Sequence, residues 1–204
     1  MHSLASKVDQ ELNTKEQIEW IATEARKVLP DDSYSAKMYN FIQKSYINNP
    51  DKNNWEKTRD QVFERYQLHS SDGYKYKNPF DSGINFAASL VSLFYGEGDF
   101  KRTIQIGTLS GWDSDNPTAT WGGLLGFILG KKKISKIFHN NISNDYWIHR
   151  TRRNFMDRTP NTKGEDTFEQ LAKRAIFIID RVVIDELKGG VDLEKNLWYI
   201  PQPM

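Results

Sequence analysis

The segment from Pro117 to about Leu129 constrains the fold of this chain more than any other. Small residues recur at the spacing of one helix face, at Ala119, Gly122, Gly123 and Gly126. Each glycine costs about 1 kcal/mol relative to alanine inside a helix, so we expect another helix backbone to approach this face closely. Large apolar residues cover much of the remaining surface, at Trp121, Leu124, Leu125 and Ile128. A helix that is apolar nearly all round belongs in the centre of a bundle.

The rest of the chain also shows helical periodicity with turn chemistry at the ends of each run. The sequence therefore predicts an all-α fold with little strand, and with helices near 15–28, 34–47, 55–67, 82–95, 100–109, 117–129 and 167–187. Thr14 and Gln17 have the spacing of a capping box for the first helix. Residues 139–166 are polar and turn-rich and predict a long surface excursion, and 197–201 predict an extended strap. We find no internal repeat and no clear domain linker.

Composition restricts the classes of function. A chain of 204 residues suits one large domain, and its net charge of +1 offers no field to attract nucleic acid or an anionic membrane. The absence of cysteine excludes disulfides, thiolate-bound zinc and a cysteine nucleophile. The longest apolar run is too short to span a bilayer, and residues 1–7 contain no apolar signal core. We therefore expect a cytoplasmic protein without nucleic-acid or membrane partners.

Two carboxylates stand just before the glycine-rich helix, at Asp113 and Asp115, and Asn116 follows them. Carboxylate and amide oxygens are hard ligands that suit Mg²⁺, Mn²⁺ or Ca²⁺. The same spacing also fits a plain role, in which Asp115 or Asn116 caps the helix and Asp113 faces solvent. An EF-hand is excluded because Leu124 stands where that loop requires glutamate.

The stretch around these carboxylates resembles the motif of the ADP-ribosylglycohydrolase family, which is Gly-x-Asp-x-Asp-Thr, then Ala, then a glycine-rich helix. The matching residues are Gly111-Trp112-Asp113-Ser114-Asp115-Asn116, then Ala119 and Gly122-Gly123-Leu124-Leu125-Gly126. The resemblance extends to the helix and Tyr-Gly-x-Gly-Asp-Phe turn within 86–100, to 167–172 and to Ile200-Pro201. It covers most of the chain from about Thr14 and is strongest over 84–130.

The resemblance implies an orthogonal all-α bundle with two Mg²⁺ or Mn²⁺ ions in a central cleft. It also implies hydrolysis of ADP-ribose from a modified protein or another ADP-ribose-containing molecule. In the family, both aspartates and the following threonine of the motif are metal ligands, and they correspond here to Asp113, Asp115 and Asn116. Asp81 and Asn85 flank the cleft-side helix in the resemblance and are candidates for substrate contact, with helix capping as the other role for Asp81.

The chain departs from the family pattern in two ways. Asn116 stands in place of threonine, although its amide oxygen can also ligate a metal. The family takes its other ligands from a Thr-Asp-Asp cluster and a nearby acidic residue in its N-terminal half, and no such cluster occurs here, since Asp31-Asp32 follows Pro30. We therefore expect residues 1–204 to be the C-terminal portion of a single family domain, apparently truncated at the N-terminus.

This interpretation predicts an enzyme when the domain is complete and an inactive chain in isolation. An alternative is a non-catalytic member that binds ADP-ribose without cleaving it, or that has a structural role like the lens crystallins that resemble this family. A third possibility is an α-helical interaction domain in which Asp113 has no metal partner. The basic stretch His149–Arg153 fits a solvated surface better than a phosphate contact, and Gly96-Glu97-Gly98 fits a helix–helix turn better than a dinucleotide loop.

Overall fold

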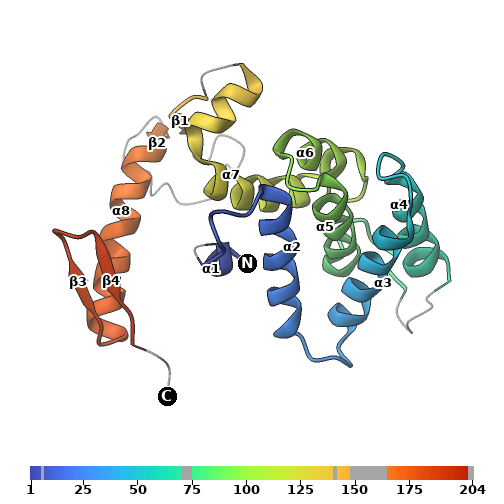
Figure 1. Ribbon diagram of the computed structural model, residues 1–204, viewed down its shortest axis with the longest axis horizontal. Coiled ribbons are helices and arrows are strands. Elements are labelled where there is room, and N and C mark those ends of the chain that lie inside the picture. The colour runs from blue at the N-terminus through green and yellow to red at the C-terminus, as the bar shows by residue number, and fades with distance from the viewer. Residues whose placement is uncertain (6, 70–74, 140–141, 148–164, 202–204) are drawn as a thin grey trace. The chain divides into compact units, whose positions relative to one another are not determined.

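The computed structural model describes residues 1–5, 7–69, 75–139, 142–147 and 165–201, and it divides into two compact units, Met1–Asn140 and Asn141–Met204 (Figure 1). The first unit is helical: α1 (His2–Ala5), α2 (Thr14–Lys27), α3 (Tyr34–Asn48), α4 (Glu56–Phe63) with a π-helical continuation η1 (Glu64–Leu68), α5 (Ser82–Gly96), α6 (Phe100–Leu109) and α7 (Asp115–Phe138). The second unit contains β1 (Asp145–Trp147), β2 (Glu165–Thr167), α8 (Phe168–Arg181) with a π-helical continuation η2 (Val182–Glu186), β3 (Gly190–Asp192) and β4 (Leu197–Tyr199). The predicted all-α class is confirmed, because the strands are only three residues long.

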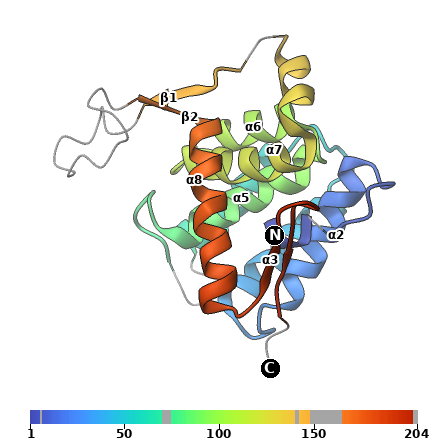
Figure 2. The same ribbon diagram turned by 90° about the vertical axis from the view of Figure 1, so that its left-hand side faces the viewer.

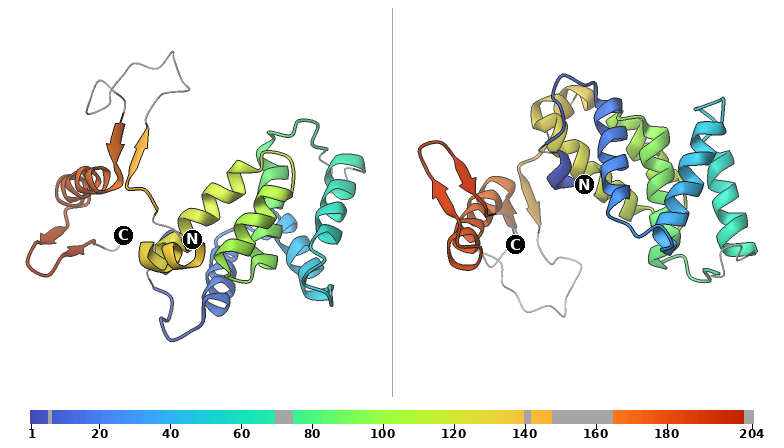
Figure 3. Two further views of the ribbon diagram at one scale, coloured as in Figure 1. Left: turned by 90° about the horizontal axis from the view of Figure 1, so that it is seen from above. Right: turned by 60° about the horizontal axis from the view of Figure 1, so that its bottom comes forward.

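Helix α5 is the centre of the first unit. It packs against α3, α4, α6 and α7, and these helices are seen from two further directions in Figure 3. No charged residue occurs between Ser82 and Gly96, and every residue from Ala87 to Gly96 is buried. A helix without a polar face gains most by being surrounded, which explains its central place.

The glycine-rich helix α7 does not occupy that centre, contrary to our expectation. One face is buried through Trp121, Leu124 and Leu125, whereas Ala119 and Gly123 are exposed. Close approach depends instead on Gly107 of α6, where a Cβ atom would lie 3.1 Å from Thr118 Cγ2 and 3.2 Å from Ser92 Oγ. The composition of α7 alone could not show which of its faces meets a neighbour.

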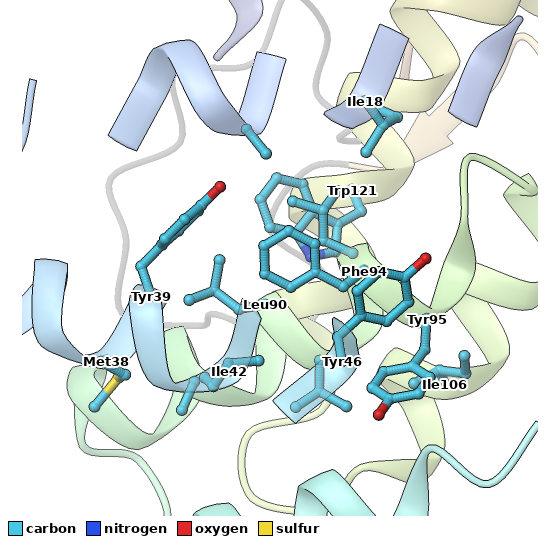
Figure 4. Packing of buried hydrophobic residues seen from close by; sticks show 14 of the residues in the cluster. Ile18, Met38, Tyr39, Ile42, Tyr46, Leu90, Phe94, Tyr95, Ile106 and Trp121 are labelled. Carbon is cyan, nitrogen blue, oxygen red and sulfur yellow. The ribbon is translucent and has the colours of Figure 1, made fainter. Parts of the chain in front are cut away.

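An aromatic cluster fills the space between α3 and α5 (Figure 4). Tyr46 stacks on Phe94 with ring centroids 5.7 Å apart and meets Tyr95 edge-on at 5.1 Å. Trp121 joins the cluster from α7, and its indole N–H donates to the carbonyl oxygen of Ser89 at 2.7 Å. Such ring pairs add to the free energy gained by burying the rings.

Several helix ends differ from the predicted ones because of local hydrogen bonds and backbone conformation. The capping box of α2 is formed by Asn13 and Glu16 rather than by Thr14 and Gln17. Gln17 is buried, and its side-chain amide donates to the carbonyl oxygen of Asp9. Gly130 interrupts α7 with φ of 74° and ψ of 158°, but the chain then resumes a helix to Phe138, beyond the end expected at 129.

The second unit consists of two small antiparallel strand pairs and α8 (Figure 2). The predicted surface excursion over 139–166 contains β1 and the start of β2, and His149–Arg153 lies outside the described residues. The predicted strap at 197–201 contains β4, which pairs with β3. Helix α8 has no buried residue, although its apolar side chains follow helical spacing. None of the described helices has the length and apolar character needed to cross a bilayer.

The hydroxyl of Tyr95 provides a first test of the core. This side chain is fully buried, and its oxygen lies 2.6 Å from Thr58 Oγ1 and accepts a hydrogen bond from Asn49 Nδ2 at 3.0 Å. Tyr95→Phe leaves both buried partners with one hydrogen bond fewer, so we expect a loss of about 1–2 kcal/mol in the free energy of unfolding. Urea unfolding curves measure this loss, and an unchanged midpoint would show that the hydroxyl contributes no net stability.

Candidate metal site

The two carboxylates lie where a tight loop joins α6 to α7. Ser110 closes α6 by donating from its hydroxyl to the carbonyl oxygen of Ile106 at 2.7 Å. Gly111 and Trp112 then take positive φ values of 90° and 54°, which reverse the chain. A left-handed backbone conformation costs tryptophan free energy. Here the N–H of the half-buried indole ring donates to Gln67 Oε1 at 2.7 Å, and this hydrogen bond offsets part of that cost. The loop is therefore attached to η1 through a side chain.

Asn85 also holds this loop in place. Its side chain is 3% exposed, and its amide nitrogen donates to the carbonyl oxygens of Pro79 at 2.8 Å and Asp81 at 3.0 Å. Its amide oxygen accepts from the backbone N–H of Asp113 at 3.0 Å. One buried residue of α5 therefore links the loop before α5 to the loop that carries the carboxylates.

Asp81 lies at the N-cap position of α5, but its side chain caps no helical N–H group. Its carboxylate accepts instead from the backbone N–H groups of Lys77 at 3.3 Å and Asn78 at 3.2 Å. The structure thus brings Asn85 to the loop of Asp113, whereas the carboxylate of Asp81 bonds within the loop before α5.

Asp113 and Asp115 face each other across the start of α7. A hydrogen bond with the Asp115 carboxyl raises the pKa of Asp113 above its usual range, and desolvation and the negative charge of Asp115 raise it further. Asp113 is partly buried, whereas Asp115 and Asn116 are exposed. Asn116 is positioned by its backbone N–H, which donates to the carbonyl oxygen of Asp113 at 3.0 Å.

The start of α7 differs slightly from the prediction. The helix begins at Asp115, with Ser114 at the N-cap position, so Asn116 lies in the first turn and Pro117 after it. An aspartate at the first helical position is stabilised by the partial positive charge of the helix N-terminus. The exposed carboxyl of Asp115 therefore lies at a favourable place in the first turn of α7.

The family model described as ADP-ribosylglycohydrolase matches residues 2–166, which is most of the chain. This chain belongs to the ADP-ribosylglycohydrolase family. Members of this family act on ADP-ribosylated substrates and generally depend on metal ions. No curated protein and no solved structure gives a significant match to the chain.

The donor set of this family member suits one part of such a metal centre. Two neighbouring carboxyl groups repel each other when both are ionised, and a divalent cation between them would relieve that repulsion. Asn116 adds a neutral amide oxygen on the same turn. Over the described ranges, no group of three or more Asp, Glu, His or Cys side chains is arranged to hold a metal ion. The three residues therefore offer an incomplete coordination shell.

Sequence reasoning did not identify the residues that position this loop. Gln67 lies in a predicted helix and carries no sequence signal for a contact with Trp112. Trp112 carried a weak signal, because a large aromatic side chain directly after a glycine in a polar loop is expected to pack against a neighbouring element. Asn85 was identified as a candidate for substrate contact, and its hydrogen bond to the backbone of Asp113 appears only in three dimensions.

The proximity of the two carboxyls predicts how Asp113 titrates. Asp115→Asn removes the negative charge that raises the pKa of Asp113, and the new amide can donate to an ionised carboxylate. We therefore expect the pKa of Asp113 to fall toward or below that of an ordinary aspartate. NMR titration of the Asp113 carboxyl carbon measures this change, and the same titration of exposed Asp32 serves as the control. A pKa that stays raised in the variant would contradict the pairing.

Proposed function

We propose that this chain provides metal-holding residues of a hydrolase that removes ADP-ribose from a modified protein or from another acceptor. The observation that carries this proposal is the pair of carboxyls, Asp113 and Asp115, on a loop held by buried Asn85. In the proposed site, Asp113, Asp115 and Asn116 bind one or both of two Mg²⁺ or Mn²⁺ ions.

Each residue has a separate task in this proposal. Asn85 sets the backbone of Asp113, so that the carboxylate keeps its place without a metal. Asp115 holds a negative charge at the N-terminus of α7, and Asn116 presents its amide on the same turn. When bound, a divalent cation would orient ribose hydroxyls and a water and would stabilise charge that develops at the anomeric carbon.

Metal titration tests the proposed ligands directly. Mg²⁺ requires near-octahedral oxygen coordination, and three residues supply only part of it, so we expect Mn²⁺ or Mg²⁺ to bind the 204-residue chain with a Kd of ~1 mM or weaker. Asp113→Asn and Asp115→Asn should each weaken this binding by about tenfold or more, because each removes one charged ligand. Asp32→Asn, an exposed acidic residue outside the site, is the matched control.

Affinity should also depend on pH. Because the raised pKa of Asp113 means that a proton competes for the pair, Mn²⁺ affinity should fall as the pH is lowered toward that pKa and level off above it. Calorimetry at several pH values measures this dependence. Equal Mn²⁺ affinity in the wild type and in both aspartate variants would place the metal elsewhere.

An activity assay tests the reaction. We expect the chain alone to release no ADP-ribose from an ADP-ribosylated protein, and to release it when joined to a family segment that carries Thr-Asp-Asp. Asp115→Ala in the joined protein should abolish release while the circular dichroism spectrum stays helical. Full activity of the Asp115→Ala protein would overturn the assignment of this residue.

Asn116 favours a second candidate function, since it stands where the family motif has threonine. A member with an altered ligand set could bind ADP-ribose without cleaving it. Calorimetric titration with ADP-ribose in the presence of Mn²⁺ distinguishes the two functions, because the second predicts saturable binding with no product. Asn116→Thr in the joined protein would then be expected to gain hydrolysis.

A further inference from the structure

Trp112 takes a backbone conformation that tryptophan rarely adopts. Its φ of 54° lies in the left-handed region, where the Cβ atom crowds the neighbouring carbonyl oxygen. Residues in such conformations persist only when the surrounding structure fixes them. Because Trp112 directly precedes Asp113, the contacts that fix its φ also set the direction of the chain that carries the carboxylates.

Packing and a hydrogen bond hold the Trp112 side chain. Its ring is partly buried and packs against the hydrophobic core of the first unit. Its indole N–H, which is the donor of this side chain, donates to Gln67 Oε1 at 2.7 Å. Apolar packing is non-directional, whereas a hydrogen bond requires its donor and acceptor to be aligned. The bond to Gln67 is therefore the contact that selects one orientation of the ring.

Gln67 lies on a turn that is itself well anchored. The π-helical segment η1 is closed by a hydrogen bond from the backbone N–H of His69 to the carbonyl oxygen of Glu64 at 3.0 Å. Tyr66, the neighbour of Gln67, is fully buried, and its carbonyl oxygen accepts from the backbone N–H of Tyr76 at 2.9 Å. Gln67 therefore offers a fixed acceptor from an element that is remote in sequence from the carboxylate loop.

Asp113 is held by a different helix. Its backbone N–H donates to Oδ1 of buried Asn85 in α5 at 3.0 Å. Relaxation of Trp112 to an ordinary negative φ would rotate the two sides of the loop against each other by roughly 100° or more. The loop could not then keep both attachments, so the left-handed φ of Trp112 and the hydrogen bond at Asp113 depend on each other.

We propose that Gln67 and Trp112 are positioning residues for the loop that carries Asp113 and Asp115. Their hydrogen bond holds Trp112 in the left-handed conformation, and this conformation keeps Asp113 bonded to Asn85. The loop is thus fixed to two elements at adjacent residues, to η1 through Trp112 and to α5 through Asp113. The consequence for metal binding rests on the proposed function, whereas the control of the Asp113 backbone by Gln67 does not.

Hydrogen exchange of the full chain in metal-free buffer tests the control of the backbone. Gln67→Leu removes the acceptor, so the Asp113 N–H should exchange about three- to tenfold faster, as expected for one lost hydrogen bond. Gln67→Glu keeps an acceptor oxygen and should restore slow exchange. The Tyr76 N–H reports on η1 itself and should keep its rate in both variants. Unchanged exchange at Asp113 in Gln67→Leu, or equal acceleration at Tyr76, would overturn the proposal.

A double-variant cycle tests whether the two residues act through one bond. Trp112→Phe removes the donor and keeps an aromatic ring, so it should accelerate exchange at Asp113 as Gln67→Leu does. The two changes together should differ from either one by about twofold or less, because both remove the same hydrogen bond. Multiplied effects in the double variant would show that the two residues act separately and would also overturn the proposal.

Mn²⁺ titration tests the consequence for the site. Gln67→Leu should weaken Mn²⁺ binding by about three- to tenfold. Gln105→Leu, at an exposed position of α6, is the matched control and should leave the affinity within about twofold. Faster exchange at Asp113 with unchanged Mn²⁺ affinity would support the positioning role and reject Asp113 as a metal ligand, so the failure of either proposal can be recognised separately.

Discussion

Gly98→Ala is expected to lower the free energy of unfolding by about 2–5 kcal/mol. Gly98 has φ of +77°, a conformation that costs alanine about 1–2 kcal/mol. A Cβ atom there would also lie 2.7 Å from the backbone nitrogen of Lys15 and 2.7 Å from the carbonyl carbon of Thr14. Backbone atoms at the start of α2 cannot move aside cheaply, so the turn after α5 would separate from α2.

Gly111→Ala is the matched control. Gly111 also has a positive φ, of +90°, but a Cβ atom there would meet no atom within 4 Å. Its expected cost is therefore the conformational part alone, about 1–2 kcal/mol. Urea unfolding measures the loss in the free energy of unfolding for each variant, and the difference between the two losses is the steric cost at Gly98. Equal losses would show that the turn at Gly98 does not pack against α2 as closely as described.

The second large effect is expected at Asn85. Asn85→Leu keeps the approximate size of the side chain but removes its three hydrogen bonds, which leaves the N–H of Asp113 and the carbonyl oxygens of Pro79 and Asp81 without this partner. Since an unsatisfied buried polar group costs about 1–3 kcal/mol, we expect a loss of about 2–4 kcal/mol in total. The exposed residue Asn48 offers the same substitution as a control, with a change of about 0.5 kcal/mol or less.

The Asn85 variant also tests the link between this helix and the carboxylates. Because the Asp113 backbone loses its anchor, Mn²⁺ affinity should fall by about tenfold or more, as for other residues that orient metal ligands. Asn85→Asp keeps the acceptor for the Asp113 N–H but sets a buried carboxylate oxygen against the carbonyl oxygens of Pro79 and Asp81, so we expect it to lose stability as well while keeping more of the Mn²⁺ affinity than Asn85→Leu. A stable Asn85→Leu protein with normal Mn²⁺ affinity would show that the loop holds its shape without this residue.

The sequence by itself determined the helices and the grouping of the carboxylates. Apolar spacing and turn residues located α2 to α6 to within a few residues, because periodic burial and helix ends are local properties of the chain. The motif around Asp113 and Asp115 was sufficient to predict the family, which the match over 2–166 confirms. Asp113, Asp115 and Asn116 are close together because they are close in sequence.

Tertiary structure alone decided which surfaces meet. It placed α5 rather than the glycine-rich helix at the centre, and it left Gly123 exposed while Gly107 makes the close approach. It also brought Asn85 and Gln67 to the carboxylate loop. The physical reason is that composition shows how much apolar or small surface a helix has, whereas the partner of each face depends on how all the helices fill space together.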